Sequence, residues 1–285
     1  MYFAMKRDLF YDEHDVSADK LAVFKQHVYD YYRANTRDFP WRKTRDPYAI
    51  LVSEIMLQQT QTYRVEPKYN AFMTRFPTVQ SLGKAPLCDV LAYWQGLGYN
   101  RRALMLKRAA EQIVENFDGY LPEDPETLQT LAGVGPYTAC AVSTFAFEMG
   151  HVFIETNIRT VFLHHFFPDQ EKVHDKLLLP LIAAALDREN PRDWYYALMD
   201  YGVYLKKTYG NANKRSRHYT KQSKFEGSDR QVRGEIIRQL VQKKIISPAS
   251  IANEMSRALD VVTNIFAELV AEQLIAFEDR HWYIK

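Results

Sequence analysis

The 285-residue sequence contains only two cysteines, Cys88 and Cys140. Two thiols cannot build a disulfide framework, and they cannot supply the four thiolate ligands of an iron–sulfur cluster. We therefore expect a chain that works in a reducing, intracellular setting and holds no iron–sulfur cluster.

The sequence also lacks a long apolar run. The longest, from Leu177 to Leu186, contains a proline and is too short to cross a bilayer. The first residues mix charged and apolar side chains, unlike a secretory signal peptide, and residues 1–16 are predicted to form an irregular arm. These features predict a cytoplasmic protein with no membrane contact, associated with the nucleoid if the source is bacterial.

An excess of charge of one sign is missing as well. The 37 Lys and Arg residues nearly balance 35 Asp and Glu residues, so the net charge of +2 alone does not indicate a nucleic-acid partner. The distribution is more informative, because residues 206–224 carry seven basic side chains and no acidic one. These are Lys206, Lys207, Lys214, Arg215, Arg217, Lys221 and Lys224. Such a run either is a solvated loop or follows a phosphate backbone.

What the sequence does contain is helical periodicity from residue 17 to about residue 200, with no strand-like alternation. Ser17 is the predicted N-cap of the first helix, and Asp46-Pro47 begins a helix that is apolar almost all round. Further helices are predicted at 64–76, 86–97, 101–117, from 125, at 136–147, and two or three between 158 and 200. Residues 201–227 are polar and basic and are predicted to form a loop or linker.

Residues 228–285 form a separate small unit in this interpretation. Three helical patterns are followed by two strand-like runs, 274–278 and 282–284, an order that resembles a winged helix. The outer face of the third helix carries Asp260, Glu268 and Glu272, which is a poor surface for a phosphate backbone. We therefore expect this helix to serve packing or contact with another protein through residues 228–285, rather than major-groove readout.

The buried helix that begins at Pro47 carries Glu54. Burial of a carboxyl group disfavours its charged form, so this residue either pairs with a basic side chain or acts as a proton donor. The helix alone leaves both interpretations open. The run Gln58-Gln59-Thr60-Gln61 follows directly, and its amide and hydroxyl groups either cap the helix and face solvent or reach base edges.

Glycine is scarce, with 11 residues in the whole chain, yet Gly133-Val134-Gly135 forms a turn between two helical patterns. Glycines permit a tight turn, and the amides at the start of the following helix can hold a phosphate. A simple helix end is the alternative. Glu155 follows an apolar run, an arrangement that can hold a carboxylate in a dry pocket.

Several motifs resemble the helix-hairpin-helix DNA glycosylase superfamily, and most of all the MutY-type adenine DNA glycosylases, over roughly residues 20–205. The motifs are FPWR at 39–42, DPY at 46–48, SEIMLQQTQ at 53–61, FPT at 76–78, WQGLGY at 94–99, LAGVGPYTA at 131–139 and ALMDYG at 197–202. The resemblance implies an all-α, two-lobed glycosylase fold with a small C-terminal winged-helix-like α+β unit. Its parts would be residues 1–30 with 151–227, a six-helix lobe at 31–150 with the hairpin, and residues 228–285.

The resemblance also implies roles for individual residues. Glu54 would protonate the departing base. Glu155 and Asn157 would flank the sugar, and Glu155 would stabilise the positive charge that develops on it. Tyr137 stands where lyase-competent relatives carry a lysine, which implies a glycosylase without a lyase step. The residues expected to contact DNA are Gln58, Gln59, Thr60, Leu131, Gly133, Val134, Gly135, Lys214, Arg215 and Arg217.

The chain departs from the family at three places. The family has Asp at the position of Glu155, and the extra methylene moves the carboxylate by about one bond length, a misplacement that can cost ~100-fold in rate. The cysteines that bind the cluster are absent, and the basic segment occupies their place. The winged-helix-like unit stands where the family has its module for reading 8-oxoguanine.

We therefore predict a monofunctional DNA glycosylase that removes adenine opposite 8-oxoguanine or guanine from double-stranded DNA. It is expected to work as a monomer without a metal or cofactor, although the hairpin is compatible with a monovalent cation. The alternatives are a thymine or uracil glycosylase at G mismatches and a DNA-lesion-binding protein with weakened catalysis.

Overall fold

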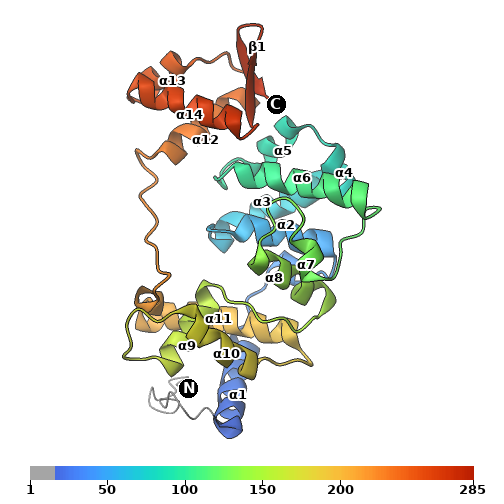
Figure 1. Cartoon of the computed structure of the whole chain (residues 1–285), viewed down its shortest axis with the longest axis vertical. Helices are drawn as coiled ribbons and strands as arrows, with labels where there is room; N and C mark the ends of the chain where they lie inside the picture. The colour runs from blue at the N-terminus through green and yellow to red at the C-terminus, as the bar shows by residue number, and fades with distance from the viewer. Residues whose placement is uncertain (1–16) are drawn as a thin grey trace. The chain divides into compact units, whose positions relative to one another are not determined.

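The computed structural model describes residues 17–285 (Figure 1), so the irregular arm predicted at residues 1–16 lies outside the described part. Within that part the chain is helical apart from one two-stranded sheet and one isolated bridge. The predicted all-α fold with a small C-terminal α+β unit is confirmed. The described chain divides into two compact units, residues 17–47 with 136–221 and residues 48–135 with 222–285.

The first unit is built around three helices that pack through aromatic side chains. Phe24 lies 5.5 Å from Phe162 and 6.0 Å from Trp194, measured between ring centroids, and joins the first helix to two others. The elements of this unit are α1 (Ala18–Asn35), η2 (Pro40–Arg42), α8 (Pro136–Phe147), α9 (Thr156–Phe166), α10 (Asp175–Ala185), α11 (Pro191–Tyr209) and η3 (Ala212–Arg215). Ser17 caps α1 as predicted, because its hydroxyl accepts a hydrogen bond from the amide of Lys20.

The loop predicted at residues 201–227 begins too early. Helix α11 continues to Tyr209, so Lys206 and Lys207 are helical. The cause is the burial of Tyr201 and Leu205, which are four residues apart and share one face of the helix. Beyond η3, residues 219–224 carry no regular secondary structure (Figure 1).

The second unit contains the remaining helices and the sheet. Its elements are α2 (Pro47–Leu57), α3 (Thr62–Arg75), α4 (Val79–Lys84), α5 (Leu87–Trp94), α6 (Arg101–Asn116), α7 (Pro125–Leu128), α12 (Asp229–Val241), α13 (Pro248–Glu254), α14 (Leu259–Ala271), β1 (Ile275–Glu278) and β2 (His281–Ile284). Every residue from Tyr48 to Met56 of α2 is buried, as its continuous apolar sequence predicts. Helix α4 was not predicted; it begins at a capping box formed by Thr78 and Ser81.

The C-terminal elements follow the predicted winged-helix order. Strands β1 and β2 pair antiparallel, with Ile275 opposite Ile284. Asp279 and Arg280 form the turn, and both have positive φ angles of 48° and 65°, as a two-residue hairpin turn requires. Helix α12 packs against α5, which places these elements in the second unit.

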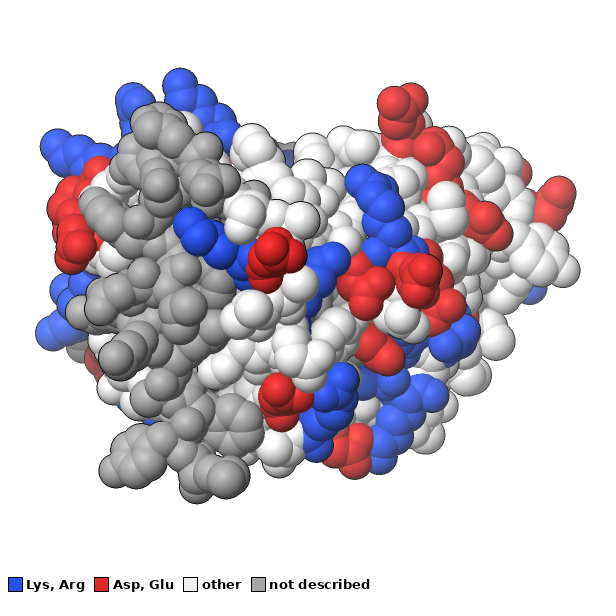
Figure 2. Space-filling view, turned by 90° about the horizontal axis from the view of Figure 1, so that it is seen from below, with Lys and Arg blue, Asp and Glu red and all other residues white. Residues whose placement is uncertain are grey.

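Charges of both signs are mixed on the surface. On the face shown in Figure 2, the described Lys and Arg side chains are interspersed with Asp and Glu. This mixture agrees with the net charge of +2. Among the helices of residues 17–285, none combines the length and the apolar character needed to cross a membrane.

Candidate functional site

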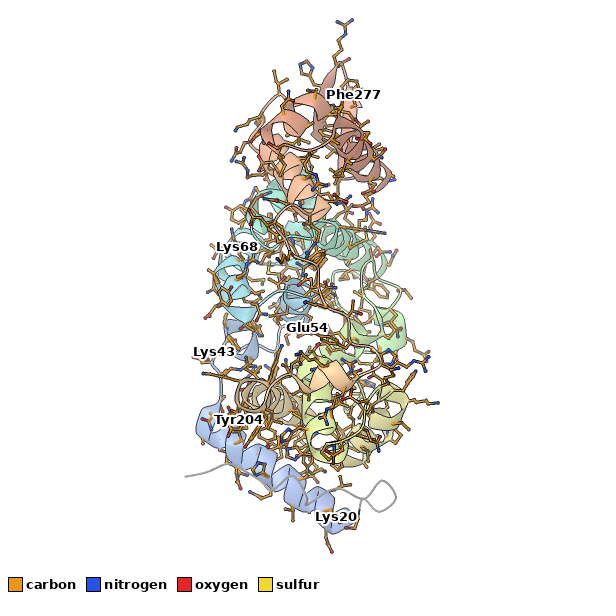
Figure 3. The ribbon with its side chains drawn as sticks, turned by 90° about the vertical axis from the view of Figure 1, so that its left-hand side faces the viewer. Lys20, Lys43, Glu54, Lys68, Tyr204 and Phe277 are labelled. Carbon is orange, nitrogen blue, oxygen red and sulfur yellow. The ribbon has the colours of Figure 1, made fainter. Side chains whose placement is uncertain are left out.

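Glu54 lies in the last turn of α2, in the second unit (Figure 3). Only 6% of the residue is exposed, and its neighbours Ser53 and Ile55 are each 1% exposed. The predicted burial of this carboxyl group is therefore confirmed. An acid held in such surroundings is suited to proton transfer to a bound group.

The turn after α2 is held by Arg102, which projects from α6. Its guanidinium donates to six acceptors, namely the carbonyl oxygens of Ile55 (2.8 Å), Met56 (3.1 Å), Gln58 (2.6 Å), Leu97 (3.3 Å) and Gly98 (3.2 Å) and the hydroxyl of Thr60 (3.1 Å). Burial lowers the pKa of Arg102 to about 10, so the side chain stays charged at neutral pH. Arg102 was not predicted as a site residue, although it lies three residues after the end of the WQGLGY motif.

This anchoring shapes the surface that Gln58, Gln59 and Thr60 present. Gln59 adopts a left-handed backbone conformation with φ of 55°, which is uncommon for a residue other than glycine, and its side chain is exposed. Gln58 and Thr60 are partly buried. Strained backbone of this kind is concentrated at ligand-binding positions, and here it turns one glutamine outward.

The predicted hairpin turn is present after α7. Gly133 has a φ of 76°, and a Cβ there would lie 2.6 Å from the Cβ of Met105, so only glycine fits. The side chains of Leu131 and Val134 are buried. The backbone amides of Gly133 and Gly135 donate to no residue of the described chain, and both glycines are exposed. Any contribution of this turn to ligand binding therefore comes from glycine amides, while Leu131 and Val134 pack inside.

In the first unit, Tyr137 is the second residue of α8. Its ring meets the edge of Phe153 at 5.7 Å between centroids, and Phe153 stacks on Tyr195 at 3.9 Å. These contacts join Tyr137 to the segment that leads to Glu155. A phenol at this position offers no primary amine for a Schiff base.

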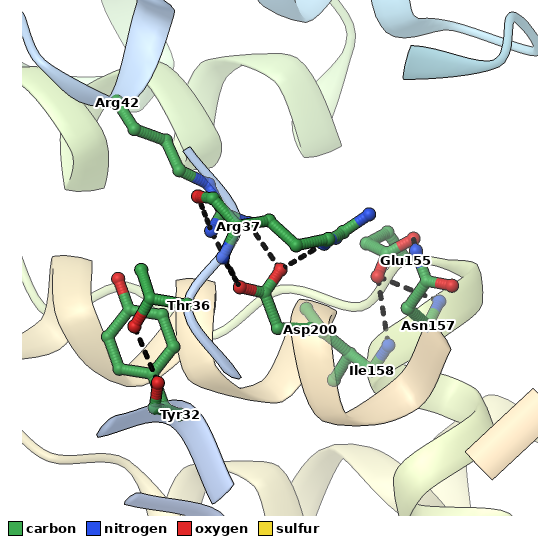
Figure 4. A network of polar contacts seen from close by, with 8 residues as sticks. All are labelled: Tyr32, Thr36, Arg37, Arg42, Glu155, Asn157, Ile158 and Asp200. Atoms are coloured by element: carbon green, nitrogen blue, oxygen red, sulfur yellow. Dashed lines mark hydrogen bonds and ion pairs between the residues drawn. The ribbon is translucent and has the colours of Figure 1, made fainter. Parts of the chain in front are cut away.

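Glu155 is the N-cap of α9 (Figure 4). Its Oε1 accepts hydrogen bonds from the amides of Asn157 and Ile158 at 2.7 and 2.9 Å, and its Oε2 accepts one from Asn157 Nδ2 at 3.3 Å. Burial raises the pKa of Glu155, and these hydrogen bonds oppose the rise. The sequence did not predict this capping role. The carboxylate retains acceptor capacity on Oε2, which has a single long hydrogen bond.

Two of the recognised motifs meet at Asp200 in the same unit (Figure 4). Its carboxylate accepts hydrogen bonds from the guanidinium of Arg42 at 2.7 and 2.8 Å and from Arg37 Nε at 2.6 Å. Two residues later, a Cβ on Gly202 would collide with the backbone carbonyl of Asn157. The ALMDYG motif therefore fixes the FPWR segment through Asp200 and allows α11 to approach the start of α9 through Gly202.

The basic segment after α11 is anchored without thiolates. The guanidinium of Arg215 donates to the carbonyl oxygens of Leu163 and Phe167 at 2.9 and 2.7 Å, and to that of Pro168. Asn213 Nδ2 donates to the carbonyl of Thr156 at 2.9 Å. Of the three basic residues of this segment that were predicted to contact DNA, Arg215 is bound to carbonyl oxygens of the protein itself, whereas Lys214 and Arg217 are exposed.

The residues in this segment do not fit an iron–sulfur cluster. The two cysteines lie elsewhere, in α5 and α8, and both are free thiols. In the described part of the chain, no three His, Cys, Asp or Glu side chains gather to hold a metal ion.

The central part of the chain matches a known protein family. Residues 52–191 match the family described as HhH-GPD superfamily base excision DNA repair protein. The adenine DNA glycosylase of Mycolicibacterium smegmatis is 44% identical over 134 residues, which are 47% of this chain and 45% of that protein. The adenine DNA glycosylase of Buchnera aphidicola subsp. Baizongia pistaciae is 32% identical over 185 residues, which are 64% and 53% of the two chains. The chain thus spans about half the length of these relatives.

Other similar proteins are named for thymine or uracil rather than for adenine. The thymine/uracil-DNA glycosylase of Methanothermobacter thermautotrophicus is 29% identical over 194 residues, which cover 67% of this chain and 88% of that protein. The solved structure of a thermostable thymine-DNA glycosylase superimposes with a TM-score of 0.60 at 29% identity, covering 66% and 88% of the two chains. An endonuclease III structure superimposes with a TM-score of 0.58 at 16% identity over 68% of this chain and 89% of the other, a likeness of fold alone.

Proposed function

Because residues 52–191 belong to the HhH-GPD superfamily of base excision DNA repair proteins, we propose that this chain hydrolyses the N-glycosidic bond of a flipped base in double-stranded DNA. The observation that carries the proposal is the SEIMLQQTQ motif, which sets Glu54 in a buried helix and ends in an exposed turn. The first feature suits an acid catalyst, and the second suits contact with unpaired bases.

The proposed substrate is adenine opposite 8-oxoguanine or guanine. Support comes from the identity of 44% to a protein named adenine DNA glycosylase, compared with 29% to one named thymine/uracil-DNA glycosylase. The LQQTQ stretch points in the same direction, because it resembles the adenine branch more closely than the thymine branch.

The proposed chemistry uses two carboxyl groups in different roles. Glu54 gives its proton to the purine as the bond between the sugar C1′ and the base nitrogen breaks. The ionised carboxylate of Glu155 stabilises the positive charge that develops on the sugar, and Asn157 holds that carboxylate by hydrogen bonds. A water molecule then adds to C1′, and its proton returns to a carboxylate, leaving free adenine and an abasic sugar.

We propose that the reaction stops at the abasic site. An enzyme that cleaves the strand by β-elimination forms a Schiff base through an amine, and this chain has Tyr137 at the position in question. Borohydride reduction during turnover should trap no covalent complex between protein and DNA. A trapped complex would show that a lysine elsewhere acts as the nucleophile.

The proposed grip on DNA combines backbone and side-chain contacts. The amides of Gly133 and Gly135 would donate to phosphate oxygens, and Lys214 and Arg217 would neutralise phosphates. Gln59 would enter the base stack. The protein is proposed to act as a monomer, with no cofactor beyond a monovalent cation at the hairpin.

A second candidate is a thymine or uracil glycosylase at G mismatches. The share of each relative's length that matches this chain favours it. The match covers 88% of the thymine/uracil-DNA glycosylase but only 45% of the adenine DNA glycosylase from Mycolicibacterium smegmatis. Tyr137 is compatible with this branch as well.

A duplex panel distinguishes the candidates. Each duplex carries one pair, adenine opposite 8-oxoguanine, guanine or cytosine, or thymine or uracil opposite guanine, and base release is measured in single turnover. We expect release of adenine opposite 8-oxoguanine and guanine and no release of thymine or uracil. The reverse pattern would establish the second candidate, and tight binding without release from any duplex would leave a lesion-binding protein.

A further inference from the structure

A groove lined by both polar and apolar surface begins in the second unit at the turn after α2. It has a volume of about 830 Å³, within the range of ligand-binding clefts. Its first wall is formed by residues 59–61 and by residues 95–100, the turn that contains most of the WQGLGY motif. Arg102 donates hydrogen bonds to both turns, through the carbonyl oxygens of Gln58 and Gly98, and so ties them together.

The second wall comes from the C-terminal part of the chain. Gln222 and Arg230 line it, together with other residues of α12 and α13. Figure 1 shows α12 at the same end of the unit as α5. Residues of α12 and α13 and residues 59–61 thus line the same groove.

The two walls are joined at Tyr99. Its hydroxyl accepts hydrogen bonds from Gln222 Nε2 at 2.5 Å and from Arg230 Nη1 at 2.7 Å. The guanidinium groups of Arg102 and Arg230 each lie over its ring at 5.4 Å from the centroid. Tyr99 itself has a left-handed φ of 48° and is 36% exposed. The C-terminal part thus controls how this aromatic ring is presented to the groove.

The groove suits a nucleotide better than a neutral peptide. Its glutamine amides can both donate and accept, and a guanidinium offers paired donors for two adjacent acceptors on a guanine-type base. The carboxylate of Glu235 is paired with Arg238 at 2.8 Å, whereas Arg64 and Arg230 have no carboxylate partner within residues 17–285. Arg64, Arg230 and Arg238 outnumber the two carboxylates of the lining, Glu235 and Glu254, so the groove has a small excess of positive charge. That excess, beside amide groups and an exposed ring, favours a base with its phosphate.

We propose that the C-terminal unit forms one wall of the groove that receives the nucleotide opposite the excised base, and that Gln222 and Arg230 set which opposite base is accepted. The proposal rests on the proposed glycosylase function. The groove starts five residues after Glu54, at an exposed turn, and flipping of the target leaves its partner base unpaired on the duplex side. Arg230 and Gln222 act by positioning Tyr99 and by exchanging their hydrogen bonds with it for hydrogen bonds to that base.

The test uses the full chain and four variants. Gln222→Ala and Arg230→Ala each remove one hydrogen bond to Tyr99, and Arg230→Lys keeps the charge but loses the paired donors. Arg233→Ala is the matched control, because Arg233 lies on the same helix, pairs with Glu268 and Glu272, and does not line the groove. Thermal melts confirm folding of each variant.

Two readouts separate this proposal from the proposed function. The first is the ratio of single-turnover release rates for adenine opposite guanine and adenine opposite cytosine. It should fall about tenfold in Arg230→Ala and in Gln222→Ala, recover partly in Arg230→Lys, and stay unchanged in Arg233→Ala. The second needs no catalysis: 2-aminopurine opposite a non-cleavable abasic analogue should change fluorescence on binding, and the change should shrink in both alanine variants.

Each outcome decides a different point. Folded alanine variants with an unchanged rate ratio and an unchanged 2-aminopurine response would overturn the role of the C-terminal wall. Absence of base release by the wild type from every duplex would overturn the glycosylase function alone, because the fluorescence comparison still reports contact with the opposite nucleotide. If Arg230→Ala does not fold, the same two readouts are compared between the wild type, Arg230→Lys, which keeps the positive charge, and Gln222→Ala.

Discussion

Glu54 and Glu155 show how one residue type serves two roles in different local structures. Glu54 sits inside a helix whose neighbours are buried, and Glu155 sits at the first position before a helix, where two backbone amides reach its carboxylate. The burial of Glu54 could be predicted because α2 is apolar almost all round. The capping role of Glu155 could not, because Asp, Asn, Ser and Thr are the residues that usually cap helices.

At this scale, Glu54→Gln should reduce base release by at least ~100-fold, because glutamine fills the same space but has no proton to give. Binding to the duplex should change little. Release is measured in single turnover and binding by titration. The control is Glu115→Gln, which alters an exposed carboxylate of α6 and should keep the wild-type rate. A fast Glu54→Gln variant would show that another group donates the proton.

Glu155→Asp should preserve the cap and keep or raise the release rate. Asp is a favoured N-cap residue, so the amides of Asn157 and Ile158 remain satisfied, and the shorter side chain restores the carboxylate of the family. Glu155→Ala, by contrast, should lose about 1 kcal/mol of unfolding free energy with the cap. A severe loss of activity in Glu155→Asp would mean that the pocket is built around the longer side chain.

The pH dependence of stability follows from the raised pKa of Glu155. Its folded-state pKa lies above the ordinary value of 4.5, so between the two values the native state binds more protons than the unfolded state. Stability contributed by this residue is therefore lost as pH rises above about 4.5. Glu155→Gln removes the titration, so urea unfolding from pH 4.5 to 7 should show the wild type losing stability relative to the variant. Parallel curves would contradict the shift.

At the scale of elements, the close approach of α11 to the start of α9 depends on one glycine. Gly202→Ala should lower the free energy of unfolding by about 1–3 kcal/mol, because the new Cβ meets the Asn157 carbonyl and must push the helices apart. The same displacement moves Asn157 and Glu155, so base release should fall as well. Gly83→Ala in α4 is the control, since its Cβ would meet only ordinary contacts at 3.5 Å. Equal stability of the two variants would contradict the argument.

Most helices could be predicted from apolar spacing, and the exceptions have physical reasons. Helix α4 has six residues, too few for a periodic pattern. The last two turns of α11 look like a loop in composition, but Tyr201 and Leu205 are buried against neighbouring helices. The anchoring of the Gln58–Thr60 turn by Arg102 depends on carbonyl oxygens, which no side-chain pattern reveals.

At the scale of the whole molecule, the motifs predicted the order of helices and the winged-helix-like end, but not the surfaces that distant segments form together. The groove at Tyr99 joins residues more than a hundred positions apart. The two compact units also interleave along the sequence, since each contains two separate stretches of chain. Such pairings arise from tertiary packing, and local periodicity contains no signal for them.

The central claim is that this chain hydrolyses an N-glycosidic bond without breaking the strand. The most direct test uses a duplex with adenine opposite 8-oxoguanine. Mass spectrometry measures the free adenine that is released, and the length of the adenine-containing strand is measured before and after treatment with hot alkali. The account predicts that free adenine accumulates with wild type and not with Glu54→Gln, and that the strand stays intact until alkali is added. A bound duplex that releases no base, or a strand cleaved without alkali, would contradict it.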